Sequence, residues 1–273
     1  MNPADFVTTI DNPYMPLTPG TKFRYEGTTE DGTQTVVVEV TRQTKKILGV
    51  PAVVVRDTVT EDGQIIEDTF DWFAQDRDGN VWSFGEDSKE LEDGKVVSTE
   101  GSWEAGKDGA EPGIVMKAHP KAGDKYRQEY YKGVAEDRAE VLSTTDKVTV
   151  PHGSYDNVLK TKDDSPLEPD VVQHKYYAKG VGLIREDQVE GGTGQLELVS
   201  VDNAPSPKPS PSDGSRSEPV PTDGPGDPSE PVPTGGGDTN VPPPPPPPTG
   251  PKTPDGPSGG VPSNGITPGA ARP

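Results

Sequence analysis

The chain has 273 residues, a formal charge of −20 and no cysteine. The charge argues against nucleic acid as a partner, because a phosphate backbone would be repelled. The missing thiols exclude disulfides, zinc–thiolate sites and thiol catalysis. What the composition favours is a well-solvated acidic surface, or a cationic or basic partner.

Targeting and membrane signals are weak in this sequence. It holds no apolar run of about 18 residues, so it predicts no membrane span. Residues 1–5 lack the basic and apolar regions of a signal peptide. From these residues alone, a cytoplasmic location and an export segment missing from the given sequence both stay open.

Residues 1–20 are predicted to form an extended segment that wraps the surface of the domain. Pro13, Pro16 and Pro19 fix their own φ and push the preceding residue out of the helical region. Strands are then expected in close succession, because apolar and β-branched residues alternate between Asp-Gly turns. The first of them are expected at residues 21–28, 33–41, 51–60 and 64–73, with Ile66, Phe70 and Trp72 facing inward.

The stretch Asp68–Asp87 predicts a β-hairpin. Its arms are rich in aromatic and β-branched residues, and Asp76–Asn80 forms the turn, where glycine and asparagine tolerate a positive φ. Two of the chain's three tryptophans, Trp72 and Trp82, lie in these arms. We therefore expect the hairpin to lie at the centre of the core.

The rest of the domain also predicts strands and no helix. Residues 105–123 lack clear alternation and are interpreted as an irregular crossover or a lid. Further strands are expected at residues 95–99, 124–131, 134–142, 147–150, 156–162, 171–178, 182–189 and 195–201. The prediction for residues 21–202 is an all-β antiparallel meander that closes into a barrel or a curled half-barrel, with room for a ligand inside.

Residues 203–273 differ sharply in composition. They contain no Phe, Tyr, Trp or Leu, and they include an unbroken proline run at Pro242–Pro248. Such a segment buries too little apolar surface to offset its ordering entropy, so it is predicted to be a disordered tail. It would act as a stiff spacer or dock into an aromatic groove of a partner protein.

The sequence contains no complete motif for binding a metal or a cofactor. Asp76, Asp78 and Asp87 offer oxygen ligands for a hard cation, but the register of a calcium-binding loop fails here. A plain hairpin turn is the favoured interpretation of these residues. Nucleotide-binding and nucleophile motifs are absent from the sequence, so it predicts no cofactor.

The aromatic residues carry the strongest functional hypothesis. We expect Trp72, Trp82 and Trp103, with one tyrosine from each of two adjacent pairs (Tyr130 and Tyr177), to contact a small amphipathic molecule inside the curled sheet. The leading hypothesis is therefore a non-enzymatic binding protein. A structural or adhesive envelope module with a solid core is the first alternative, and a carboxylate-dependent hydrolase is the second.

Several motifs resemble a widespread group of bacterial, mostly exported domains of unknown function. They are Asn12–Thr21, the hairpin from Asp71–Asp76 to Phe84–Asp87, Gly101–Gly106 and Lys175–Leu183. The resemblance covers residues 6–201. It implies an exported, β-rich domain of the cell envelope or exterior, similar to the curled sheets of lipoprotein carriers.

Overall fold

The computed structural model describes residues 1–28 and 32–203. The predicted disordered tail therefore lies outside the described residues from position 204 on, as do residues 29–31 between the first two expected strands. Long strands make up the first half of the described chain: β4 (Thr21–Thr28), β5 (Thr33–Ile47), β6 (Val50–Glu61), β7 (Gln64–Asp76) and β8 (Val81–Asp87). The second half has β15 (Arg138–Val150), β16 (Gly153–Ser165), β17 (Glu168–Ala178), β18 (Gly182–Glu190) and β19 (Gln195–Asn203).

Short elements precede these strands and join the two halves. Before β4 lie the 3₁₀ turn η1 (Pro3–Asp5), β1 (Phe6–Val7), β2 (Asp11–Asn12) and β3 (Met15–Pro16). Between the halves lie β9 (Glu90–Glu92), β10 (Lys95–Ser98), β11 (Trp103–Glu104), β12 (Glu111–Met116), β13 (Lys125–Arg127) and β14 (Glu129–Tyr130). Within the described ranges, no helix is long and apolar enough to cross a bilayer.

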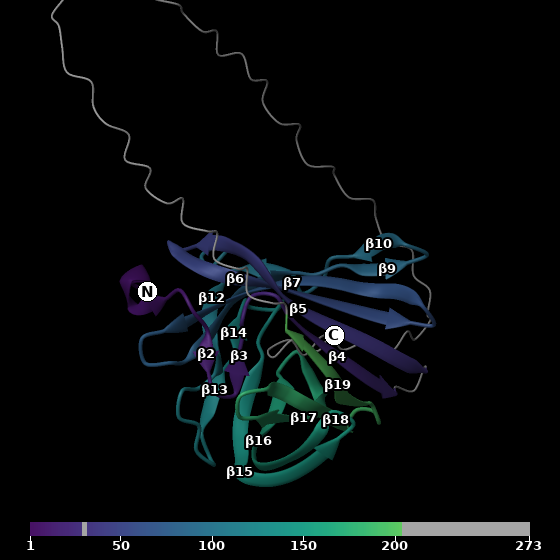
Figure 1. Ribbon diagram of the computed structural model, residues 1–273. Coiled ribbons are helices and arrows are strands. Elements are labelled where there is room, and N and C mark those ends of the chain that lie inside the picture. The colour runs from purple at the N-terminus through teal and green to yellow at the C-terminus, as the bar shows by residue number, and fades with distance from the viewer. Residues whose placement is uncertain (29–31, 204–273) are drawn as a thin grey trace, which may run out of the picture. The chain divides into compact units, whose positions relative to one another are not determined.

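The antiparallel sheet is nearly closed into a barrel (Figure 1). Successive strands pair from β4 to β8 and from β15 to β19, and β19 returns to pair with β4. On the other side, β12 joins β8 to β14, and β13 pairs with β15. The predicted fold class is therefore confirmed, and near closure leaves few unpaired strand edges.

The predicted hairpin forms between β7 and β8. Its turn is held by the Asp76 carboxylate, which accepts hydrogen bonds from the Asn80 backbone N–H at 2.8 Å and from the Asn80 side-chain amide at 2.9 Å. Gly79 has φ 91°, the left-handed conformation that a hairpin turn requires. The carboxylate of Asp76 thus builds the turn itself.

The two faces of β7 pack against different apolar clusters. Phe73 joins the main cluster, which fills the barrel and includes Tyr25, Val55 and Tyr177. Its neighbour Trp72 points to the other face, because successive side chains of a strand alternate, and joins a second cluster with Phe84 and Trp103. The prediction that Phe70 and Trp72 face the main core was wrong. The residues Trp72-Phe73-Ala74 are apolar on both faces, so period-two alternation does not identify the inner one.

Two sequence interpretations of connecting segments also need correction. The stretch 105–123 is no lid, because β12 lies within it and pairs with both β8 and β14. The two strands expected at residues 134–142 and 147–150 are one long strand, β15, whose pairing with β16 shifts register between Val141 and Lys147. Bulges in β15 hide the continuity, since each one breaks the period-two pattern.

The extended N-terminal segment lies against the main cluster. Ile10, Tyr14, Met15 and Leu17 are all buried there. The Gly180 backbone N–H donates a hydrogen bond to the Pro13 carbonyl at 2.7 Å, which ties the segment to the turn between β17 and β18. Its prolines suit this role, because they favour an extended chain that pairs only over short stretches, β1 with β7 and β2 with β3.

We expect Gly85→Ala to destabilise the domain by about 3 kcal/mol. Gly85 has φ 121°, and a Cβ atom there would collide with the Trp103 backbone carbonyl on β11. Gly94→Ala is the matched control, because Gly94 also has a positive φ, 71°, but its Cβ would meet nothing within 4 Å. The control should lose about 1 kcal/mol. Urea unfolding measures both, and equal losses would contradict the close approach of β11 to β8.

Candidate ligand pocket and buried acidic layer

Trp72 and Trp103, two of the predicted ligand-contacting residues, line one pocket of about 380 Å³. This is within the ordinary size range of small-molecule sites. We call it the tryptophan pocket; its aromatic wall is Trp72, Trp103 and Tyr131, and its polar lining is Lys45, Glu86, Asp87, Ser102, Glu104, Lys107 and Asp108. It combines a flat apolar wall with groups of both charges, which is the chemistry that an amphipathic molecule needs.

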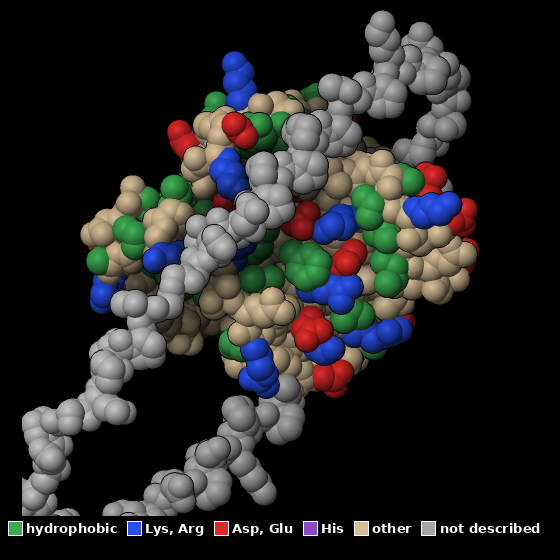
Figure 2. Space-filling view, turned by 90° about the horizontal axis from the view of Figure 1, so that it is seen from above, with side chains coloured by type: hydrophobic (Ala, Val, Ile, Leu, Met, Phe, Trp, Pro, Cys, Tyr) green, Lys and Arg blue, Asp and Glu red, His purple; other side chains and the backbone are tan. Residues whose placement is uncertain are grey.

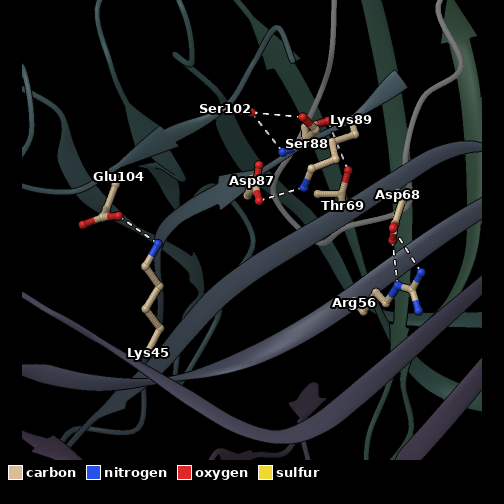
Figure 3. Close-up of polar contacts among 9 residues, drawn as sticks. All are labelled: Lys45, Arg56, Asp68, Thr69, Asp87, Ser88, Lys89, Ser102 and Glu104. Carbon is tan, nitrogen blue, oxygen red and sulfur yellow. Dashed lines mark hydrogen bonds and ion pairs between the residues drawn. The ribbon is translucent and has the colours of Figure 1, made fainter. Parts of the chain in front are cut away.

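Lys45 and Glu104 meet across the pocket (Figure 3). The Lys45 ammonium bonds to Glu104 Oε2 at 2.8 Å and lies 3.2 Å from the centre of the Trp72 ring. Lys107 reaches the same carboxylate oxygen at 2.9 Å. Burial would raise the pKa of the Glu104 carboxyl, but its hydrogen bonds to the two lysines hold that pKa below the usual value. Glu104 is therefore an anion near neutral pH.

Polar contacts also order the part of the pocket that is lined by Ser102 and Asp87. The Ser102 hydroxyl accepts a hydrogen bond from the Ser88 backbone N–H at 2.9 Å and donates to the Ser88 carbonyl at 3.2 Å. Lys89 bonds to the Asp87 carboxylate at 2.8 Å, as Figure 3 also shows. These contacts fix the segment before β11 against the end of β8. The pocket is thus formed by the fold itself.

The other predicted ligand-contacting residues lie elsewhere. Trp82 is partly buried, stacks edge-on with Phe6 and donates a hydrogen bond to Asp76 at 2.8 Å. Tyr130 lines a different pocket of about 550 Å³, where Arg127 lies over its ring. Tyr177 is buried in the main cluster. The structure thus brings Trp72 and Trp103 together in the pocket and packs Trp82 against the same apolar cluster, outside the pocket lining. Tyr130 and Tyr177 lie apart from them.

The candidate cation ligands on the hairpin do not converge. Asp76 already accepts three hydrogen bonds from Asn80 and Trp82. Asp78 is exposed in the turn, whereas Asp87 lies at the far end of β8 and pairs with Lys89. Among the residues that the structure describes, no group of three or more His, Asp or Glu side chains has the arrangement of a metal site.

Many polar and charged side chains are buried alongside the apolar clusters, and several of them act on one another electrostatically. Within residues 1–28 and 32–203, the fully or almost fully buried charged side chains are Asp57, Glu67, Asp71, Glu86, Glu129, Asp137, Asp163, Lys175 and Glu186. We call this set the buried acidic layer. Buried charges are costly unless they are paired or neutralised by a proton. The protonation state of each carboxyl in the layer therefore depends on the charges next to it.

Lys175 is the cation of this layer and is 1% exposed. Its ammonium lies 3.7 Å from Glu186 Oε2 and 3.8 Å from Asp163 Oδ2. Burial would lower the pKa of Lys175, but the surrounding carboxylates outweigh it and hold the pKa above its ordinary value. Asp163 also accepts hydrogen bonds from Thr161 and from Gln128, the latter at 3.1 Å.

Two carboxyls of the layer bind their protons unusually tightly. Burial raises the pKa of Glu186 to about 7 against the opposing effect of Lys175. Burial and the nearby charge of Asp137 raise the pKa of Glu129 well above the usual value. Glu129 also accepts a hydrogen bond from the Trp103 indole N–H at 2.9 Å. Trp103 thus joins the wall of the tryptophan pocket to the buried acidic layer.

Sequence reasoning missed the buried acidic layer. With 46 acidic residues in the chain, the acidic character of a position carries little information. The available signal was cross-strand pairing: Asp163 is opposite Gln173 and Lys175 is opposite Glu186. Reading it requires the register of β16, β17 and β18, and a shift of one residue would move every one of these side chains to the other face.

No family model matches the chain, and no curated protein matches it at a significant level. Solved structures do match over 70% of this chain and 99% of their own. One is a protein from Bacteroides fragilis described as exported and as having a YmcC-like fold, with a TM-score of 0.42 and 19% identity. Another, from Parabacteroides distasonis and described as a lipoprotein, has a TM-score of 0.34 and 13% identity. At these values neither structure assigns a function to this chain.

Proposed function

We propose that this chain is a non-enzymatic, acidic β domain of the bacterial envelope or exterior that binds a small amphipathic molecule in the tryptophan pocket. The observation that carries the proposal is that Trp72 and Trp103 line one pocket of about 380 Å³ with carboxylates and ammonium groups around it. Aromatic walls with a few placed charges are typical of small-molecule sites. The location rests on the sequence resemblance to exported domains.

The ligand is placed in the tryptophan pocket because the cavity beside the main apolar cluster is too small to hold it. Beside Phe23, Tyr25 and Phe73 the free space is about 30 Å³, on the order of one water molecule. A filled core is also what the structural or adhesive alternative requires. That alternative predicts that the tryptophan pocket stays empty of any retained molecule.

The test compares native and denaturing mass spectrometry of the full chain purified from its source cells. We expect extra mass under native conditions in the wild type and its loss in Trp72→Leu, because the aromatic wall is removed. Trp82→Leu is the matched control, since Trp82 lies on the same hairpin but does not line the pocket. It should keep the extra mass. Equal native and denatured masses in the wild type would refute the proposal.

A carboxylate-dependent hydrolase is a second candidate, favoured by one observation. Glu186 and Glu129 have raised pKa values in a buried acidic setting, and perturbed carboxyls of this kind occur at catalytic sites. Charge networks with a purely structural role perturb pKa values in the same way. The raised pKa values therefore support catalysis only if the chain is also found to hydrolyse a substrate. Hydrolysis of a substrate by the wild type that is lost in Glu129→Gln, with the fold intact, would establish it.

A further inference from the structure

The tryptophan pocket holds a cation between the Trp72 ring and the Glu104 carboxylate, and we call this position the seat. The Lys45 ammonium lies 3.2 Å from the centre of the Trp72 ring while it bonds to Glu104 at 2.8 Å. An ammonium over an indole face is attracted by the negative face of the ring, and partial desolvation strengthens the attraction. The Glu104 side chain is 19% exposed, so this seat is partly shielded from water.

The charge around the seat also favours a cation. Carboxylates outnumber ammonium groups in the lining of the pocket. Glu86, which is 4% exposed, forms part of the wall. The chain as a whole carries a charge of −20, which would concentrate cationic molecules near its surface. Figure 2 shows acidic and basic side chains interspersed on one face of the domain.

Lys45, the side chain that occupies the seat, can move away from the Trp72 ring. Lys45 is 36% exposed and reaches the Trp72 ring through a flexible stem. When Lys45 swings out, Glu104 keeps its second partner, because Lys107 holds the same oxygen at 2.9 Å. A ligand ammonium entering the seat would therefore replace one cation with another on Trp72, and Glu104 would remain paired.

We propose that the tryptophan pocket selects amphipathic molecules that carry an ammonium group, and that Lys45 competes with this group for the Trp72 face. The inference rests on the proposed function and names its ligand class. The apolar part of the molecule lies along Trp103 and Tyr131, which complete the aromatic wall. The ammonium takes the place of the Lys45 Nζ atom, between the Trp72 ring and the Glu104 carboxylate.

The probes are octylammonium, octanoate and octanol, which share one apolar chain and differ in head group. Binding to the full chain is measured by titration with NMR detection of the three tryptophan indole N–H signals. We expect octylammonium to bind at least tenfold more tightly than octanoate. The Trp72 and Trp103 signals should move, and the Trp82 signal should stay in place.

The decisive variant is Lys45→Met, which frees the Trp72 face and keeps the apolar stem. We expect its affinity for octylammonium to rise about tenfold, the scale of one partly desolvated cation–π contact. Lys147→Met is the matched control, because Lys147 is an 81% exposed lysine whose ammonium pairs with Asp156. It makes the same change in net charge and should leave the affinity unchanged.

The outcomes separate the two proposals. Preference for octanoate or octanol at the same two tryptophans would refute ammonium selection and leave ligand binding in the pocket intact. An unchanged or weaker affinity in Lys45→Met would refute the competition by Lys45. Failure of every probe together with equal native and denatured masses of the source protein would refute the proposed function itself.

Discussion

Lys175→Met is expected to lower the free energy of unfolding by about 3–5 kcal/mol at pH 8. The substitution removes the ammonium that lies 3.7 Å from Glu186 and 3.8 Å from Asp163, and so leaves buried carboxylates without their cation. At pH 5 the loss should be smaller. Because the pKa of Glu186 is about 7, that carboxyl is already neutral at pH 5 and needs no cation.

Urea unfolding at both pH values measures this effect. Lys147→Met is again the control, since its pair with Asp156 is exposed to solvent and adds little to stability. Similar losses in the two variants at pH 8 would mean that Lys175 does not neutralise the buried acidic layer. A Lys175→Met chain that unfolds fully at pH 8 but folds at pH 5 would agree with the expectation.

The wild-type domain is expected to lose stability as the pH rises from 5 to 8. The pKa of Glu186 is about 7 in the folded chain, above the ordinary value of 4.5. The folded state therefore binds this proton more tightly than the unfolded state. The resulting stabilisation is complete below pH 4.5 and is lost as the pH rises through 7, and for Glu186 it amounts to about 3 kcal/mol. Glu129, whose pKa is also raised, acts in the same direction.

Glu186→Gln isolates this contribution, because glutamine has a similar shape and cannot ionise. Its unfolding free energy should fall much less between pH 5 and pH 8 than that of the wild type. Glu168→Gln is a useful comparison, since the pKa of Glu168 is also about 7 but the residue is only half-buried and screened by water. A wild-type profile that is flat from pH 5 to pH 8 would contradict the raised pKa values.

The strands and the barrel were predictable because their signals are local. Asp-Gly turns separate short alternating runs, and the turn at Asp76–Asn80 forms where the sequence indicates. The face of Trp72 was not predictable, because β7 is apolar on both sides at that point. Strand β12 was missed because only six residues form it, which is too short for a clear alternating pattern. Its partners, β8 and β14, are separated from it in the sequence, so no short hairpin turn marks the pairing.

The candidate site was predictable in part. The tryptophans stand out by type, and Trp72 and Trp103 do share a pocket. The contact of Lys45 with the Trp72 ring depends on the arrangement of β5 and β7, which are not neighbours in the sheet order. The buried acidic layer depends on the register of several strands together, as at Lys175 and Glu186. Such long-range relations leave no local pattern in a single sequence.

The central claim is that the tryptophan pocket holds an amphipathic molecule. The most direct test is a crystal structure of the full chain purified from its source cells with no ligand added. We predict continuous density along Trp72, Trp103 and Tyr131, with its charged end beside Glu104. Density for ordered water alone in that pocket, with Lys45 still seated on the Trp72 ring, would contradict the claim.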